Sequence, residues 1–334
     1  MLAERALTDE FQVNTWTLDS QDRAEVAAVK EGGFVTVWES KNQDAGNGAG
    51  IYAQRFGPLG EKIGLEVPVN TSTAGTQKEP DVTCNADGRC LVVWWSEGTG
   101  IATEVYGQWF DAQFEKTGDE FQVNYFSTES QRNPVAASSP QGGTWVVWDG
   151  AGPGDDKGIF LRRLNEDGTP VDTEVQVNTF TNGIQAYPKL AVLGDGSFLV
   201  TWLSNGADGS DSGISMRLYS PDGDATSEEV VVNETVESYQ SLPSVVAVSD
   251  DRFLVMWTSN DDAWGRYTTT TGDFIGGEFQ MNVFTPDSQG GSKAAKLHSG
   301  DFVVTWVSED QDGNGYGVFA QIFNPAGEKT APAP

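Results

Sequence analysis

The chain has few of the residues that build most metal and catalytic centres, with two cysteines and one histidine among 334 residues. Cys84 and Cys90 have no histidine or further cysteine to complete a zinc site. His298 has no evident nucleophile partner in the sequence. The phosphate-binding, dinucleotide-binding and G-x-S-x-G motifs are also absent. The sequence therefore gives little direct support for catalysis.

Positive charge is scarce as well. The chain carries 20 Lys and Arg against 49 Asp and Glu, a net charge of -29. Such a surface repels nucleic acid and anionic membranes, so we expect neither as a partner. No apolar run is long enough to cross a bilayer, which predicts no membrane insertion. The first nine residues have no apolar segment of the kind that a signal peptide needs.

Sustained helical periodicity is missing, and the chain instead repeats itself six times. Within each copy Asn is followed by Gln 7 residues later and by Trp 17 residues after that, and successive copies start 56, 54, 54, 55 and 49 residues apart. Such a period is typical of a repeat architecture, in which neighbouring units bury each other's apolar faces. The six triplets are Asn14, Gln21 and Trp38; Asn70, Gln77 and Trp94; Asn124, Gln131 and Trp148; Asn178, Gln185 and Trp202; Asn233, Gln240 and Trp257; and Asn282, Gln289 and Trp306.

Each copy holds four short segments rich in Val, Ile, Phe, Tyr and Trp, separated by Gly, Asp, Asn and Pro, which indicates four strands. In the fourth copy they are 188–193, 197–203, 213–219 and 229–233. Six four-stranded units of even spacing predict an all-β, six-bladed β-propeller with antiparallel blades. We expect residues 1–328 to form this single domain, with repeats starting near 10, 66, 120, 174, 229 and 278, and 329–334 to be a linker-like tail.

The repeats also resemble a known family. Proline three residues after the Gln, then a strand, a Gly-containing turn and an apolar run ending in Trp are similar to the repeats of TolB-type, WD40-like six-bladed propellers. Glu-Phe-Gln-Val-Asn at 10–14 and 120–124 resembles repeats of large bacterial surface or secreted proteins. The resemblance implies that the Pro-led strand is innermost, and that residues 10–14 close the ring as the outer strand of the sixth blade. Copies 1 and 6 depart from it, with Ala24 and Ser292 at the proline position.

The recurring tryptophans have two interpretations. A Trp at the same strand position of every blade indicates packing between blades, and stacking on sugars is the alternative. The repeated Asn and Gln are then expected to pair with backbone groups between blades. Five aromatic residues are not explained by the repeat and are the candidates for exposed binding contacts: Trp16, Trp95, Trp109, Tyr125 and Trp264.

The loop between the second and third strands is acidic in most copies. Asp310, Asp312 and Asn314 fit the first half of a calcium loop, because alternate oxygen ligands around a Gly-containing turn suit this ion. Asp208, Ser210 and Asp211 form a weaker version in copy 4, and Asp44 lies in the same loop of copy 1 with Asn42 and Asn47. No Glu follows at the bidentate position, where Gln321 stands, so an ordinary polar loop is the alternative. Calcium is the one cofactor that the sequence suggests.

Cys84 and Cys90 flank a hairpin turn, where they can form a disulfide or remain buried free thiols. A disulfide would indicate an oxidising compartment, and the acidic, linker-ended sequence predicts an extracellular or cell-surface location. We expect the domain to belong to a larger multi-domain chain or assembly. The main functional hypothesis is a non-catalytic binding or adhesion module for a polysaccharide or surface protein. The alternatives are a propeller hydrolase or lyase with channel carboxylates and a divalent metal, and a structural spacer.

Overall fold

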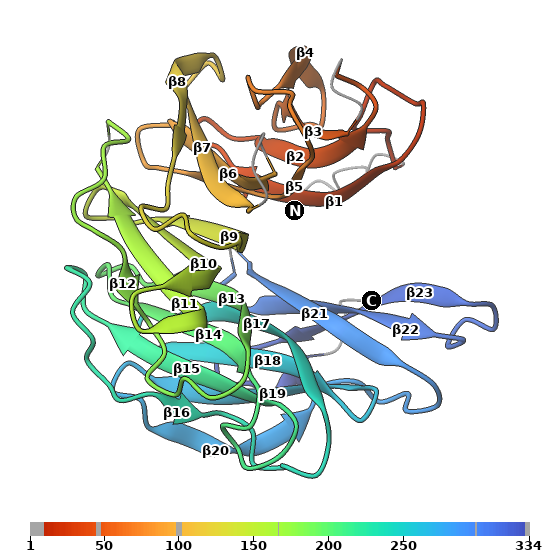
Figure 1. The fold of residues 1–334 in the computed structure, drawn as a ribbon. Helices are drawn as coiled ribbons and strands as arrows, with labels where there is room; N and C mark the ends of the chain where they lie inside the picture. Colours follow the sequence, from red (N-terminus) through yellow and green to blue (C-terminus); the bar gives the residue numbers. More distant parts are fainter. Residues whose placement is uncertain (1–9, 45–47, 98–101, 166, 298, 331–334) are drawn as a thin grey trace.

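The computed structural model describes residues 10–44, 48–97, 102–165, 167–297 and 299–330, which form 24 strands and no helix. The strands make six separate four-stranded antiparallel sheets. Figure 1 shows them following one another around a centre, from red at the N-terminus to blue at the C-terminus. The predicted six-bladed β-propeller is thereby confirmed. None of the described residues forms an apolar helix long enough to span a membrane.

Every blade is built from strands that are consecutive in the chain. Blades 1 and 2 are β1 (Gln21–Ala28), β2 (Phe34–Lys41), β3 (Ala49–Phe56) and β4 (Lys62–Pro68), then β5 (Gln77–Cys84), β6 (Cys90–Ser96), β7 (Glu104–Phe110) and β8 (Lys116–Gln122). Blades 3 and 4 are β9 (Gln131–Ser138), β10 (Thr144–Gly152), β11 (Asp155–Leu164) and β12 (Val175–Gln176), then β13 (Gln185–Val192), β14 (Phe198–Ser204), β15 (Gly213–Tyr219) and β16 (Val230–Val231). Blades 5 and 6 are β17 (Gln240–Ser249), β18 (Arg252–Ser259), β19 (Asp262–Thr269) and β20 (Phe274–Gln280), then β21 (Gln289–Lys296), β22 (Phe302–Glu309), β23 (Tyr316–Phe323) and β24 (Lys329–Thr330).

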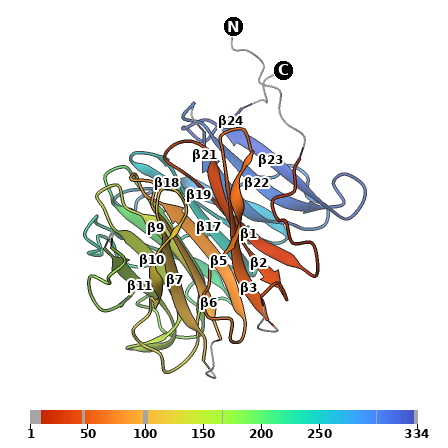
Figure 2. The ribbon, with the colours of Figure 1, turned by 90° about the horizontal axis from the view of Figure 1, so that it is seen from above.

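The first strand of each blade lies at the centre of the ring. β1, β5, β9, β13, β17 and β21 contact one another in succession, and residues of all six line one cavity, which we call the central channel. Figure 2 shows the sheets from above. The second strands of blades 1 to 5 are nearly continuous runs of apolar residues buried on both faces, as β6 and β14 illustrate, whereas β22 of blade 6 alternates between buried and more exposed residues. The framework tryptophans lie on these second strands and are at most 6% exposed. Burying this apolar surface between blades is the main stabilising contribution to the fold.

Two recurring polar contacts fix the position of each blade on the next. The framework Asn side chain accepts the backbone N–H of a residue near the start of the preceding third strand, at 2.7–2.9 Å. The framework Gln side chains of blades 2 to 6 are fully or almost fully buried. A buried amide group without a hydrogen-bond partner would lower the free energy of unfolding. The hydrogen bonds of the framework side chains therefore also select one register for the chain.

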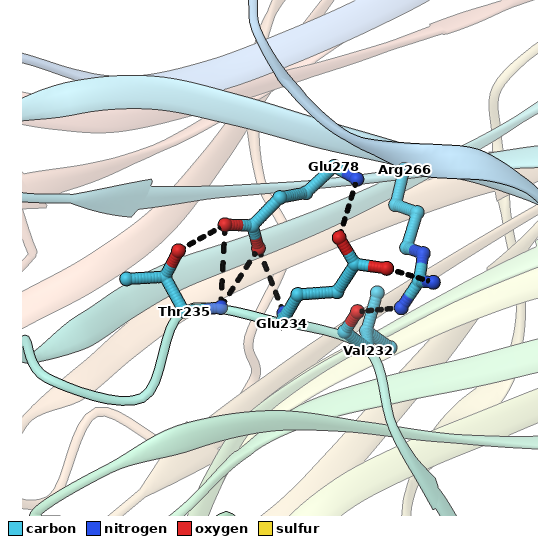
Figure 3. Close-up of polar contacts among 5 residues, drawn as sticks. All are labelled: Val232, Glu234, Thr235, Arg266 and Glu278. Atoms are coloured by element: carbon cyan, nitrogen blue, oxygen red, sulfur yellow. Dashed lines mark hydrogen bonds and ion pairs between the residues drawn. The ribbon is translucent and has the colours of Figure 1, made fainter.

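In blades 1 to 5, a glutamate in the outer strand or directly before it forms the second contact. Glu278 accepts the backbone N–H groups of Glu234, at 2.8 Å, and Thr235, at 3.2 Å, from the segment that enters blade 5 (Figure 3). Arg266 extends the contact with an ion pair to Glu234. The same glutamate contact recurs at earlier blades, through Glu66, Glu120, Glu174 and Glu229.

The seam between blades 6 and 1 differs from the other five. Five apolar clusters join blades 1 to 6 in order, and none among the described residues joins blade 6 to blade 1. Val318 of β23 is 76% exposed, whereas its counterparts Ile51, Val105, Ile159, Ile214 and Ala263 are fully buried. An ion pair of 2.5 Å between Lys293 and Glu25 links β21 to β1 at the centre. Within the described part of the chain, the sixth interface is therefore held at the channel and has no apolar core further out.

The predicted closure by residues 10–14 is corrected. These residues form no strand, and β24 supplies the outer strand of blade 6, where Thr330 pairs with Ile322 and Lys329 with Phe323. Lys329–Thr330 repeats Lys116–Thr117 of β8, so this part of the expected tail can enter the sheet in the same way. Phe11 packs instead on Phe56 of blade 1, at 5.5 Å between ring centroids. Residues 331–334 of the expected tail lie outside the described residues.

Candidate active site

The first strand of every blade contains a bulge at the same place. The pairing with the second strand skips two residues just after the framework Gln, and the second residue after that Gln has a positive φ of 50–67°. A non-glycine residue in this conformation costs about 1 kcal/mol or more, and such strain is concentrated at functional sites. We call these residues the bulge ring: Arg23, Glu79, Asn133, Tyr187, Leu242 and Gly291.

The bulge ring lines a cavity of about 490 Å³ in the central channel. Each bulge starts just after its framework Gln, so the ring lies at the end of the channel where the chain enters the first strands. All six bulge-ring residues have the same backbone conformation, but their side chains differ in chemistry. In chain order they carry a guanidinium, a carboxylate, an amide, a phenol, an aliphatic group and a single hydrogen atom. Because the backbone requirement is constant, this variation points to a role in binding or chemistry.

A second set of side chains supports the bulge ring from the second strands. The residue that follows each framework Trp is Glu39, Trp95, Asp149, Leu203, Thr258 or Val307. Three of these side chains accept the N–H of the next blade's bulge residue: Glu39 from Glu79 at 2.7 Å, Asp149 from Tyr187 at 3.4 Å, and Thr258 from Gly291 at 3.2 Å. Thr258 does this with a hydroxyl group, so a carboxyl group is not needed for that structural task.

Glu79 has the most contacts in the ring. Its carboxylate accepts the Nη1 of Arg23 at 2.7 Å and the indole Nε1 of Trp95 at 2.8 Å. The Nε of Arg23 also lies 3.3 Å from Glu39. Burial raises the pKa of Glu39 from 4.5 to about 7. Arg23 therefore connects two carboxyl groups of adjacent blades, of which Glu39 is largely protonated in mildly acidic solution.

Asp149 is the third carboxyl group at this mouth. It accepts the Nδ2 of Asn133 at 2.6 Å, and burial raises its pKa from 3.8 to about 7, with the nearby charge of Glu79 adding to the increase. A carboxyl group with a pKa near 7 can donate a proton at neutral pH. Glu39, Glu79 and Asp149 all belong to blades 1–3, whereas blades 4–6 place Leu203, Thr258 and Val307 at the second-strand position. The mouth is thus chemically one-sided.

The next layer of the channel is balanced in charge. Glu25 and Asp81 lie on blades 1 and 2, and Lys189 and Lys293 lie on blades 4 and 6. Burial, with a contribution from the charge of Glu25, raises the pKa of Asp81 to about 6, and the Ala136 N–H donates to its carboxyl group at 2.7 Å. In a chain of net charge -29, a balanced channel suits an uncharged ligand better than a strongly charged one.

The acidic loops make contacts that hold the fold together. Asp208 accepts the Nδ2 of the framework Asn233 at 2.9 Å, as Asp155 does for Asn178 at 2.8 Å. Asp310 and Asp312 accept N–H groups of their own loop, from Gly315 and Asn314. Across the described part of the chain, no three His, Cys, Asp or Glu side chains gather as a metal site. Ser210 donates its N–H to Asp208, and Asp211 is exposed. Asn47 and His298 lie outside the described residues.

The candidate binding aromatics are spread over the molecule. Tyr125 is 71% exposed, Trp16 and Trp264 are half-buried, and Trp95 and Trp109 are buried. Only Trp95 contacts the channel mouth, through Glu79 and through a cation–π contact with Arg132 at 5.5 Å. Cys84 and Cys90 are joined in a disulfide at the opposite end of β5.

The residues of the channel mouth were not predicted from the sequence, because the repeat is defined by its constant residues. The signal lies in the variable ones: the second residue after each Gln and the residue after each Trp. Comparing those two positions among the six copies would have singled out Glu39, Glu79 and Asp149.

No family model and no curated protein matches the chain. Solved structures share its fold. An α-L-arabinanase of Penicillium chrysogenum complexed with arabinobiose aligns with a TM-score of 0.59 at 14% identity, over 91% of this chain and 93% of that one. The α-L-arabinofuranosidase of Fusarium graminearum, complexed with arabinobiose, gives 0.60 at 11% identity over 91% and 93%. The NanB sialidase of Streptococcus pneumoniae gives 0.61 at 6% identity over 89% and 67%.

These comparisons correct two expectations. The propeller stands, but the neighbours are glycosidase propellers, and the TolB-type family is not confirmed. The hypothesis of a non-catalytic binding or adhesion module conflicts with these neighbours and with the carboxyl groups gathered at the channel mouth. At this level of identity the likeness shows the shared fold alone, so the chemistry has to be argued from the site.

Proposed function

We propose that the protein is a glycoside hydrolase that cleaves a neutral polysaccharide or oligosaccharide at the bulge-ring mouth of the channel. The observation that carries the proposal is a linked group of three carboxyl side chains: Glu79 lines the mouth, Asp149 lines the adjoining hollow and is hydrogen-bonded to the mouth residue Asn133, and Glu39 is buried behind Glu79. Glycosidic bond cleavage needs one carboxylic acid that donates a proton and one carboxylate that acts as base or nucleophile. Different environments for neighbouring carboxyl groups provide that division of roles.

Asp149 is the proposed general acid, because its raised pKa of about 7 keeps a protonated population at neutral pH. Glu79 is the proposed base or nucleophile, since Arg23 and the Trp95 indole hold its carboxylate in place. Glu39 is a positioning residue that fixes the backbone of Glu79 through their 2.7 Å hydrogen bond. The neighbours bound to arabinobiose support a neutral, arabinose-containing glycan as the first substrate class to test.

The test is release of reducing sugar from arabinan, xylan and galactan. We expect wild type to cleave at least one of them, and Asp149→Asn and Glu79→Gln to lower the rate by about 100-fold or more, because a general acid or base contributes 10²–10⁴ to the rate. Asp222→Asn, an exposed change in the turn after β15, is the matched control and should keep full activity. Absence of hydrolysis in wild type, or full activity in both site variants, would refute the proposal.

Several sequence predictions stay as accompanying proposals. An extracellular location is supported by the Cys84–Cys90 disulfide, since such bonds persist in oxidising compartments. Calcium at Asp310, Asp312 and Asn314 is supported by the alternate spacing of their oxygen atoms. A surface-protein partner and membership of a larger assembly rest on the amino-acid sequence alone.

A further inference from the structure

Two hollows lie against blade 3, outside the channel mouth. The first, of about 580 Å³, has Arg132, Asp149, Glu129 and Ile184 in its wall. The second, of about 520 Å³, lies further out, against Gly154, Thr181 and Gly183. Each is within the size range of ligand sites in proteins, and both are open to solvent along one side.

The two hollows share a wall, and a hydrogen bond links the wall of the first hollow to that of the mouth. Asn133 lines the mouth and is hydrogen-bonded to Asp149, which lines the first hollow. Asp156 and Lys157, on the hairpin between β10 and β11, line both hollows. The side chains of Asn133 and Asp149 thus stand between the mouth and the first hollow, and with the hairpin they mark a path from the bulge ring toward the second hollow. A small ligand would fill the mouth alone, whereas only a chain-like ligand would use the whole path.

The surface chemistry of this path suits a hydroxyl-rich chain. Lys157 and Arg132 provide donors, Asp156 and Glu129 provide acceptors, and all four side chains are exposed. Two exposed cations face two exposed anions, and the lining residues Asp149 and Asp155 add two further carboxyl groups, so the path does not favour an anionic polymer. Ile184, 43% exposed, adds an apolar patch of the kind on which a sugar ring can pack.

We propose that blade 3 carries the outer subsites for a neutral oligosaccharide chain, which lies from the bulge ring across the β10–β11 hairpin. This inference rests on the proposed function and refines it. Asp149 stands where the mouth meets the first hollow, so the bond it protonates joins the sugar in the mouth to the sugars over blade 3. The protein then prefers longer chains to disaccharides.

The test measures binding of arabinobiose and of longer arabinan oligomers by calorimetry, with the full-length Asp149→Asn variant so that the sugars stay intact. We expect the longer oligomers to bind at least tenfold more tightly than arabinobiose. Adding Lys157→Ala should reduce that ratio by about three- to tenfold, the effect of losing roughly one hydrogen bond to the ligand. Lys30→Ala, in the turn between β1 and β2 at the other end of the channel, is the control and should leave the ratio unchanged.

The outcomes separate the two proposals. If arabinobiose and the longer oligomers bind equally, or if Lys157→Ala leaves their ratio unchanged, the blade 3 subsites are refuted while the hydrolase proposal stands. If no oligomer of any length binds and wild type cleaves no glycan, the proposed function fails, and the subsites fail with it. Thermal melting of each variant shows whether the fold is intact.

Discussion

The seam between blades 6 and 1 can be tested with one substitution made at two equivalent positions. Val105 and Val318 occupy the same place in the third strands of blades 2 and 6, yet Val105 is fully buried and Val318 is 76% exposed. Changing either to Ala deletes the same two methyl groups. At Val105 each deleted group costs about 0.8 kcal/mol in transfer free energy, and the cavity left behind raises the total to roughly 2–3 kcal/mol. At Val318 most of that surface is already in water, so we expect a loss below about 0.5 kcal/mol.

Urea denaturation followed by tryptophan fluorescence measures both changes in the free energy of unfolding. The two variants can be compared when the slope of their unfolding free energy against urea concentration equals that of wild type. A loss at Val318 as large as that at Val105 would refute the open seam. It would indicate that blade 6 is covered in solution, as the sequence-based closure by residues 10–14 requires.

Three further predictions concern charge, the disulfide and calcium. Burial raises the pKa of Asp149 from 3.8 to about 7, so its protonated form stabilises the fold fully below about pH 4, and this contribution is lost as the pH rises through 7. The unfolding free energy should therefore fall less steeply over that pH interval in Asp149→Asn than in the control Asp222→Asn. An unchanged slope in Asp149→Asn would contradict the assignment. Reducing the Cys84–Cys90 disulfide, which closes a loop with a sequence separation of 6, should lower the free energy of unfolding by at most about 2 kcal/mol. Glycan hydrolysis should stay intact, because this hairpin lies at the far end of the channel. Loss of activity with an intact fold would count against the proposed site. Calcium should raise the melting temperature relative to chelator in wild type and have no effect in Asp312→Ala, and equal melting curves for wild type would exclude the loop as a calcium site.

The sequence predicts the architecture well because repetition and burial act together. The Asn, Gln and Trp positions are constant since each blade meets its neighbour in the same way, and a pattern with a fixed physical cause can be read from residues alone. The interface between blades 6 and 1 could not be predicted in this way, because it depends on how the two ends of the chain meet. The same chain segment, 10–14, can pair with a strand edge or pack its Phe11 on Phe56, and only the folded structure distinguishes them.

The candidate site was hidden from sequence reasoning for a related reason. Glu39, Glu79 and Asp149 are far apart in the chain and belong to no sequence motif, and their proximity is a product of ring geometry. Their pKa shifts arise from burial, which a sequence does not show. The positive φ at Glu79 and Asn133 also requires a bulge whose register is set by the neighbouring strand.

The uneven seam changes how the molecule is expected to unfold. The described residues form five apolar interfaces and no sixth, so we expect the blades to behave as a nearest-neighbour array with two ends and not as a closed cycle. Amide hydrogen exchange should then be fastest in blades 1 and 6 and slow toward the middle, since each end blade has one well-packed neighbour and each inner blade has two. Blades 3 and 4, which hold Asp149 and border the hollows beside it, are the interior of that array. The proposed general acid would then be among the last groups to fray, whereas Arg23 and Glu39 lie on blade 1, at one end of the array.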